Sequence, residues 1–517
     1  MSGPIGKKSN FYIYSSRTEN DQSSVVNASV LDDRLQPVAF KQSFAAPVRS
    51  NNIYLNINSD ITKKHKLFFS GGLYGIHSKG SGVGDFTLAG RAADTSTDGG
   101  NFQFSDTYLK NANLVSQTAV LFSSYSSQSR PRTSAVALDV SEAFSGGGST
   151  QDFNTGNLFF QAINQTTWQM GKYTIGSGAR FRAHSIDQNS QTNFNGNYIF
   201  SGRIAPVLDG ANNPLIDATG NYVAVQISSL ESYRRTLLFR QFGFSNQRIR
   251  ELGGGASQFT ISGGNPKINL SQYDYAFYVQ NSLKLTPTVA LSFGLRYENQ
   301  NNLKDRSNFA PRAGIIWAPK AKDKQKPLFS LPRISVGYGI FYSRFPVSNT
   351  LNVRLSSDAD RAQYLITDSE TLDLYPTVPS VALLKQFALP KTQRFIDNKL
   401  KTPAQVLFTI AATKKLIGGF SLNLSMTTGT TFRQIAIPNV NAPLAGTYDP
   451  LNPQASIRPS PEAGNIYAIF SNGKSKKTRF SAQLQFPKSD KLYAYLSYSF
   501  VKSKNNVVSG SGAPFDP

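Results

Sequence analysis

Two alternating segments follow one another within residues 275–300, YAFYVQNSLKLTPTVALSFGLRYENQ, and constrain the fold more than any other part of the chain. In the second segment the positions of one parity are apolar: Val289, Leu291, Phe293, Leu295 and Tyr297. Successive side chains of a β-strand point to opposite faces, so this segment would have one apolar and one polar face. A strand of about ten residues with this alternation fits the wall of a transmembrane β-barrel, whose apolar face meets lipid and whose polar face meets a wet lumen.

The same alternation recurs at residues 52–58, 333–343 and 479–487. Its polar positions are rich in Asn, Gln, Ser and Gly, which are costly to bury in a dry core. We therefore expect the polar face to meet water and the apolar face to meet lipid or a second sheet. The expected antiparallel hairpins pair 275–285 with 289–300, 309–318 with 333–343, and 479–487 with 491–501.

Length and composition favour one large sheet over several small domains. The 517 residues contain no linker or composition shift that would divide them, and 40 Gly, 36 Phe and 23 Tyr lie among Ser, Asn and Thr. This usage is typical of many strands separated by polar turns. The sequence has no run of about 18 apolar residues, which excludes transmembrane helices but not a barrel. We predict an all-β fold, an antiparallel transmembrane β-barrel.

Short and long connections alternate along the chain. The expected short turns are at 62–66, 171–172, 286–288, 416–419 and 488–491, and the expected long polar loops are at about 78–114, 189–272, 344–404 and 431–476. Short periplasmic turns and long outer loops are the asymmetry of outer-membrane barrels. Trp168 and Trp317 each precede a short connection, where their amphipathic rings would lie at a membrane interface.

The formal net charge of +23 raises the question of an anionic partner. The basic residues are scattered, however, and many lysines lie in the expected short turns, among them Lys63, Lys64, Lys172, Lys414 and Lys415. No nucleic-acid-binding motif accompanies the charge, so we expect no nucleic-acid partner.

Enzymatic chemistry finds little support in the sequence. The chain has no cysteine, which excludes disulfides, thiolate metal sites and a cysteine nucleophile. Its only histidines, His65, His77 and His184, are far apart, so no pair has metal-ligand spacing. Residues 468–475, AIFSNGKS, end like a phosphate-binding loop but have alanine where the first glycine belongs. We expect no enzyme, no bound metal and no cofactor.

Three motifs in sequence order resemble a known family. The hairpin at 275–300 ends in GLRYE, residues 308–320 read NFAPRAGIIWAPK, and residues 333–345 read RISVGYGIFYSRF. This series is similar to the barrel of TonB-dependent outer-membrane receptors, and among them to the Oar-like group. Residues 232–266 resemble a loop of that group, and residues 2–16 resemble its junction between plug domain and first barrel strand. The resemblance implies active uptake of a solute through the outer membrane of a Gram-negative bacterium.

The resemblance also implies that residues 1–517 are a partial barrel. Such receptors have a plug domain before the barrel, through which the TonB complex acts, whereas the first expected strand here lies at the start of the chain. Roughly 16 candidate strands stand against about 22 in plugged transporters. We therefore expect the plug domain and the closing strands to be absent from this chain, and the fold to be an incomplete barrel.

Two groups of residues are candidates for contact with a solute. Those expected to line the lumen are Arg180, Arg182, His184, Arg296 and Glu298. A denser group in an expected outer loop would meet an anionic solute or the phosphates of lipopolysaccharide, and it comprises Arg234, Arg235, Arg240, Arg248 and Arg250. In both groups the alternative is a purely structural or solvated role, through pairing across strands or contact with water.

Two alternatives to a TonB-dependent receptor stay open at this point. A passive, porin-like channel would share the strand pattern but lack a plug. A secreted all-β adhesin or binding protein would also alternate, but it would stay soluble without detergent. The transported solute itself is not specified by the sequence.

Overall fold

The computed structural model describes residues 1–319, 331–357, 362–387, 392–448, 456–486 and 494–507. Its dominant feature is a 17-stranded sheet, whose wall strands are paired antiparallel in chain order. These strands are β1 (Ser2–Ile5), β2 (Ser9–Asn20), β5 (Val48–Asp60), β6 (His65–Ser81), β7 (Ala93–Asn111), β8 (Leu114–Pro131), β11 (Phe153–Met170), β12 (Tyr173–Ser190), β17 (Lys267–Thr286), β18 (Val289–Gln300), β19 (Phe309–Trp317), β20 (Arg333–Tyr342), β23 (Ala404–Lys415), β24 (Ser421–Ala436), β25 (Ile466–Gln485) and β26 (Tyr495–Asn505).

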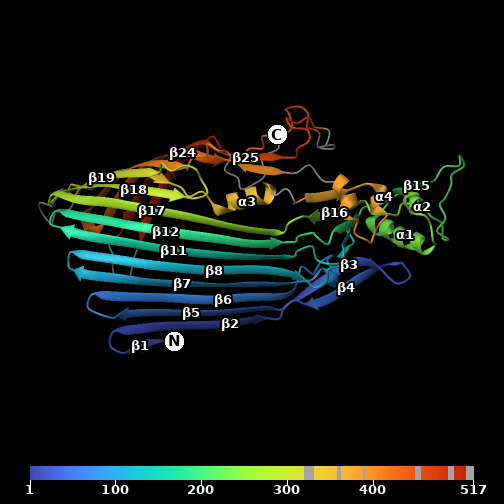
Figure 1. Ribbon diagram of the computed structural model, residues 1–517, viewed down its shortest axis with the longest axis horizontal. Helices are drawn as coiled ribbons and strands as arrows, with labels where there is room; N and C mark the ends of the chain where they lie inside the picture. The colour runs from blue at the N-terminus through green and yellow to red at the C-terminus, as the bar shows by residue number, and fades with distance from the viewer. Residues whose placement is uncertain (320–330, 358–361, 388–391, 449–455, 487–493, 508–517) are drawn as a thin grey trace.

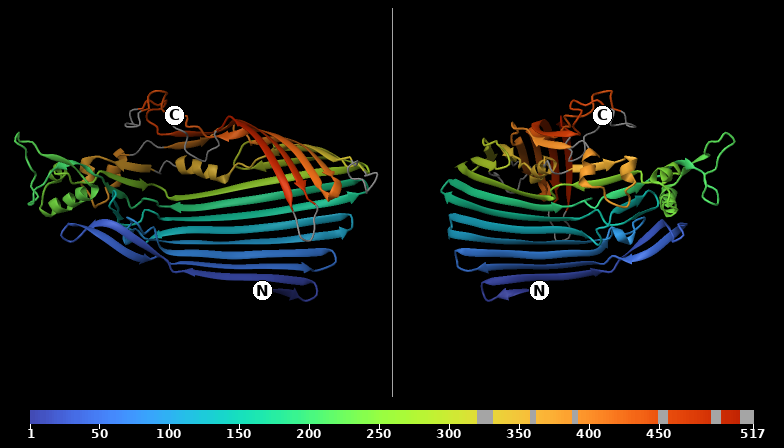
Figure 2. Two further views of the ribbon diagram at one scale, coloured as in Figure 1. Left: turned by 180° about the vertical axis from the view of Figure 1, so that it is seen from behind. Right: turned by 45° about the vertical axis from the view of Figure 1, so that its right-hand side comes forward.

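The sequence-based expectation of an antiparallel membrane sheet is confirmed. The hairpins β17–β18 and β19–β20 pair as expected, and β25 pairs with β26 so that residues 479–485 lie opposite 495–501. Residues 487 and 491–493 of the third expected hairpin lie outside the described residues. The remaining strand, β22 (Gln393–Ile396), pairs parallel to β25. The sheet curves into a trough (Figure 2), and no pairing joins its two edge strands, β1 and β26, among the described residues.

The two faces of the sheet differ as the alternation predicts. Large apolar side chains are exposed on the outer face of neighbouring strands, and Phe277 and Phe293 each expose 54% of their surface. Residues of the other parity face the hollow of the trough, where Tyr278 lies opposite Arg296. Trp168 lies on the outer face two residues before the end of β11, close to a short turn, and is 45% exposed, as expected for an interfacial aromatic.

Short turns and long connections lie at opposite ends of the sheet (Figure 1). The turns at 61–64, 171–172, 287–288 and 416–420 agree with the expected ones. The expected long loop at 78–114 is wrong, because 93–111 is a wall strand and only 82–92 connects it to β6. Polar and glycine residues there hid the alternation of Phe102 and Phe104 with Asn101 and Gln103.

At the end with the long connections, the chain folds into a separate layer that we call the outer region. It contains a five-stranded sheet in the order β10-β9-β13-β16-β21 and two hairpins, β3–β4 and β14–β15. Their bounds are β3 (Ser23–Leu31), β4 (Pro37–Ala45), β9 (Ala137–Val140), β10 (Phe144–Gly146), β13 (Asn197–Phe200), β14 (Arg203–Pro206), β15 (Ala224–Ile227), β16 (Gln258–Gly263) and β21 (Ala362–Ile366).

Short helices also occur at this end, although strands make up most of the regular structure, as expected for an all-β fold. They are α1 (Ser229–Gln241), α2 (Asn246–Glu251), α3 (Val347–Ser357), α4 (Ser369–Leu372) and α5 (Val381–Leu384), with short 3-10 turns at Ala89–Arg91 and Lys385–Phe387 and a third turn, Ile417–Gly419, at the other end of the sheet. The Ser228 hydroxyl accepts a hydrogen bond from the Glu231 amide and caps α1. No helix in the described part of the chain is long and apolar enough to cross a membrane.

The outer region has an ordinary buried core. Tyr198, Phe200, Phe259 and Ile366 have no exposed surface, and residues from β3, β9, α1 and α4 pack around them. A second, smaller core lies where the chain leaves β20 and enters α3. There Phe345 is fully buried with Leu303, Leu400 and Ile469. This second core holds the segment after β20 against the inner face of β17 and β18.

Candidate functional site

The candidate lumen residues lie side by side on the inner face of three neighbouring strands. Arg180 and Arg182 come from β12, and Arg296 and Glu298 come from β18, with β17 between them. The register places Arg182 opposite Asp274 of β17. Because strand side chains alternate, residues of one parity on three paired strands must gather on one face. Together with Arg344, which follows β20, they form a group that we call the charged cluster: Arg180, Arg182, Asp274, Arg296, Glu298 and Arg344.

Ion pairs connect all members of the charged cluster. Asp274 is its centre, with Oδ1 2.6 Å from Nε of Arg182 and Oδ2 3.0 Å from Nε of Arg344. Glu298 accepts a hydrogen bond from Arg296 and lies 3.6 Å from Nη2 of Arg180. Four guanidinium groups therefore share two carboxylates. The cluster retains a positive excess toward the hollow of the trough, which favours an anionic group there.

A cavity of about 210 Å³ opens beside the charged cluster. Its other lining residues include Gln300, Asn308 and Thr402, which are all buried. Gln300 Nε2, Asn308 Oδ1 and Thr402 Oγ1 have no hydrogen-bond partner within the described structure. Buried polar groups are normally paired, so these atoms are available to water or to a bound polar molecule. The cavity thus offers both charge and free hydrogen-bonding groups.

The segment after β20 closes one side of this cavity. The Phe345 amide donates to Oε1 of Gln300, and Nε2 of Gln272 donates to the Phe345 carbonyl, both at 3.2 Å. Asn302 in turn donates to Oε1 of Gln272 at 2.9 Å. These buried hydrogen bonds fix the backbone next to Arg344. The arginine is therefore held over Asp274 by the fold and does not depend on a flexible loop.

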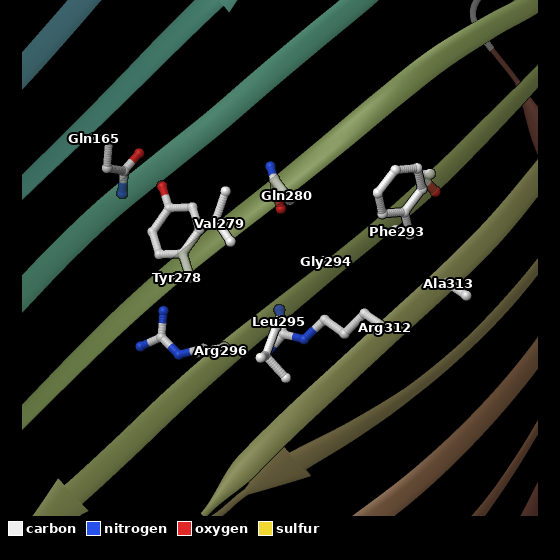
Figure 3. Close-up of a pocket in the computed structure, with 11 residues that line it drawn as sticks. Gln165, Tyr278, Val279, Gln280, Phe293, Gly294, Leu295, Arg296, Arg312 and Ala313 are labelled. Atoms are coloured by element: carbon white, nitrogen blue, oxygen red, sulfur yellow. The ribbon is translucent and has the colours of Figure 1, made fainter.

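A second hollow of about 400 Å³ continues along the inner face toward the short turns (Figure 3). Tyr278 and Gln280 of β17 and Arg296 and Arg312 of the next two strands line it. The Arg296 guanidinium lies 5.8 Å from the centre of the Tyr278 ring. A Cβ atom at Gly178 would lie 2.4 Å from that ring, so glycine is required for Tyr278 to lie flat on the wall. Arg296 lines this second hollow and also belongs to the charged cluster.

The five predicted lumen residues do not all lie in one cluster. Arg180, Arg182, Arg296 and Glu298 join one cluster, whereas His184 lies on the same face with its ring against Phe159, at 6.2 Å between centres. Asp274 and Arg344 were not among the residues predicted from the sequence. Extending the alternation of β17 by two positions toward its start would have found Asp274, which shares the parity of Tyr278. Arg344 had no such signal, because it follows the end of β20.

The five arginines of the second predicted group are not in an exposed loop. Arg234, Arg235 and Arg240 lie on α1, and Arg248 and Arg250 lie on α2. Arg235 is buried, and its guanidinium donates to Glu231 and to the carbonyls of Pro206 and Leu252 at 2.7 to 2.8 Å. The remaining partners are Glu231 for Arg234, the Tyr375 ring for Arg240, Glu251 for Arg248 and Asp373 for Arg250. The expectation that these arginines lie in a loop is wrong, because they lie on two helices and four of them pair with acidic neighbours.

Glu231 shows how strongly these arginines are engaged within the outer region. Burial raises the pKa of its carboxyl, but the hydrogen bonds and charges of Arg234 and Arg235 outweigh this, and the net pKa is lowered. Nearby, burial raises the pKa of the Tyr375 hydroxyl, which lies 3.4 Å from the Tyr233 hydroxyl. In the described parts of the chain, no group of His, Asp or Glu residues is arranged to hold a metal ion.

Comparison with known proteins agrees with this architecture. The model of a family described as outer membrane beta barrel domain matches residues 26–308 and 302–515. No curated protein matches. Among solved structures, the outer membrane transporter YddB from Escherichia coli is similar, with a TM-score of 0.59 and 13% identity over 98% of this chain and 54% of that one. The siderophore receptor PirA from Pseudomonas aeruginosa has a TM-score of 0.50 and 10% identity over 98% and 62%.

The solved structures and the family model support different conclusions. At such low identity the two structures show a shared fold only, and this chain spans about half to three fifths of their length. The family model, in contrast, matches nearly the whole chain from residue 26 onward. The exposed apolar outer face and the polar inner face are what such a domain requires in a bilayer. The chain therefore belongs to the outer membrane β-barrel domain family and is a protein of the outer membrane.

Proposed function

We propose that this chain is the barrel portion of a TonB-dependent receptor that takes up a small solute. The observation that carries the proposal is the charged cluster, which lies on the inner face of the wall beside a polar cavity. A structural ion pair alone would not need four guanidinium groups around two carboxylates. A site that attracts an anionic or strongly polar solute would need that excess.

The comparisons support a transport role. One similar structure is named an outer membrane transporter and another a siderophore receptor, and both share this fold. In the proposed receptor a plug domain and further closing strands would complete the barrel and connect it to the TonB complex. The outer region would be the part that meets lipopolysaccharide and the incoming solute.

We further propose that the charged cluster, and not the arginines of α1 and α2, contacts the solute. The α1 and α2 arginines already have partners inside the chain, so a solute would have to displace them. The charged cluster keeps unpartnered polar atoms at Gln300, Asn308 and Thr402 around a cavity. Binding there would satisfy groups that are otherwise unpaired.

Uptake in cells that express the complete gene tests both parts of the proposal. Each solute of a small panel is supplied to the parent and to the double variant Arg180→Gln, Arg182→Gln. Charge-assisted hydrogen bonds contribute about 1.5–3 kcal/mol each, so we expect uptake of the correct solute to fall by about tenfold or more. Arg17→Gln, which changes an exposed wall arginine, is the matched control and should leave uptake unchanged.

The energy requirement separates active from passive transport. Uptake that ceases when the host lacks the TonB complex supports the receptor. Uptake that persists in such a host would show a passive, porin-like channel instead. Equal uptake by the double variant and the control would remove the charged cluster from the solute path, whichever energy source is used.

A further inference from the structure

The short turns of the sheet carry a concentration of lysine that transport does not explain. Every short turn that the structure describes in full has at least one lysine in it or within a few residues of it. We call this group the lysine rim, and it comprises Lys7, Lys8, Lys63, Lys64, Lys66, Lys110, Lys172, Lys284, Lys414 and Lys415. All of its members except Lys414 are exposed. The short turns that join the wall strands lie at one end of the sheet, on the left in Figure 1.

The lysine rim has few counter-charges. Among the described residues near these turns, the acidic side chains are Asp60, which lies 3.9 Å from Lys66, and Asp106, which pairs with His65 at 2.9 Å. Arg333, at the start of β20, adds a further exposed positive charge. Carboxylates also occur at the opposite end, where Asp94 at the start of β7 and Glu231 and Asp373 in the long connections each pair with an arginine. Much of the positive charge of this chain is therefore at one edge and unneutralised.

Aromatic side chains fix the depth of the lysine rim in the membrane. Trp168 points outward four positions before Lys172, and Trp317 ends β19 at the same edge. The Lys172 ammonium lies 5.6 Å from the centre of the neighbouring Tyr173 ring. The ring centres of Phe420 and Phe486 lie 5.1 Å apart, just beyond Lys415. Interfacial aromatic rings lie at the level of lipid headgroups, so the adjacent lysines reach the phosphates.

We propose that the lysine rim is a binding site for anionic phospholipid headgroups in the leaflet that faces the periplasm. Short turns of outer-membrane barrels face the periplasm, where the lipid is phospholipid. A Lys ammonium is a compact cation that attracts a phosphate without a fixed geometry, which suits a fluid lipid surface. Several lysines along one edge would hold a lipid with net negative charge more strongly than a zwitterionic one. The rim would thereby set the depth and tilt of the wall in the membrane.

Lipid binding to the purified product of the complete gene tests this proposal. The probes are phosphatidylglycerol, which is anionic, and phosphatidylethanolamine, which is zwitterionic, and bound lipid is counted by native mass spectrometry. The rim variant carries Lys8→Gln, Lys64→Gln, Lys172→Gln and Lys415→Gln. The control variant removes the same charge from the opposite end through Lys41→Gln, Lys79→Gln, Lys267→Gln and Lys399→Gln, which are all exposed.

We expect the parent and the control variant to prefer phosphatidylglycerol, and the rim variant to lose about tenfold or more of that preference at low salt. This estimate follows from roughly fivefold in binding for each lysine near an anionic surface, partly screened. A third variant with arginine at the same four rim positions should keep the preference, because it keeps the charge. This arginine variant also separates lost charge from lost folding.

Two results would overturn the proposal. One is an equal preference for phosphatidylglycerol in the rim and control variants. The other is displacement of the lipid by a soluble polyphosphate at matched ionic strength, which would identify the rim as a site for free anions. Neither result depends on solute uptake, so the test stands apart from the proposed transport function.

Discussion

The wall and the outer region of this molecule differ in where their large apolar side chains lie. In the wall, Phe277 and Phe293 point outward and stay 54% exposed, whereas in the outer region Phe200 and Phe259 are completely buried. The wall is surrounded by lipid, so its outward apolar face needs no protein cover. The outer region meets water and must bury its apolar side chains in a core. One chain therefore contains a membrane pattern and a water-soluble pattern, divided at the ends of the strands.

This difference also separates how the two regions respond to mutation. A wall strand is held by backbone pairing on both sides, and its outward side chains touch mainly lipid. The outer region depends on a packed core assembled from segments that are far apart in sequence, such as β3, β13 and β21. Loss of core packing should open the outer region and leave the wall intact.

The largest effect is expected for Phe259→Ala in the outer region. Phe259 has no exposed surface, and its ring centre lies 4.3 Å from that of Tyr198. Truncation of a buried phenylalanine costs about 3–5 kcal/mol. We expect rapid proteolytic cleavage within residues 190–267, while the wall keeps its resistance to heat in detergent gels.

Phe293→Ala is the matched control, because it removes the same side chain from the lipid-facing wall. Its outer region should resist protease as the parent does. If Phe259→Ala also unfolds the wall, or if both variants are cleaved alike, the two regions are one cooperative unit and the comparison fails.

The same contrast explains what the sequence could and could not predict. The wall was predictable because the alternation from Val289 to Tyr297 has a period of two. This pattern can be recognised within a single strand, without information from any other segment. The outer region was not, because β13 has four residues and pairs parallel to β9, about 60 positions away. Helix α1 was taken for a loop, since its polar residues Ser229, Glu231 and Arg234 give it no clear apolar stripe.

The charged cluster was only partly predictable from the sequence. Four of its members were predicted because they share the polar parity of β12 and β18, which local sequence reveals. Asp274 and Arg344 are needed to understand why those residues come together, and only strand pairing and the second core bring them in. Strand register is a long-range property, so a single sequence gives the face of a residue but not its partner.

A medium effect is expected from arginine placed on either face of β18. Leu291 lies on the outer face opposite Leu283 and Ile315, and Ser292 lies on the inner face opposite Ser282 and Gly314. An arginine on the lipid face near the middle of the membrane costs about 2–4 kcal/mol, whereas the inner face is wet. We expect Leu291→Arg to lower the yield of folded protein in lipid vesicles, and Ser292→Arg to fold as the parent does. Equal folding of the two variants would reverse the assignment of the faces.

The smallest effect is expected from acid, and it should be confined to the outer region. The pKa of Glu231 is lowered in the folded protein from its usual value of 4.5, because Arg234 and Arg235 stabilise the carboxylate more than burial destabilises it. A lowered pKa means that this contribution to stability is complete above pH 4.5 and is lost as the pH falls through the folded pKa. We expect the near-ultraviolet circular dichroism of the buried Tyr198 and its neighbours to weaken on heating at a lower temperature at pH 3.5 than at pH 6. Glu231→Gln should reduce this pH dependence while Glu251→Gln, at an exposed ion pair, should not. A pH dependence that is identical in all three proteins would show that acid acts elsewhere, and the Glu231 pairs would then be no more than a local feature of α1.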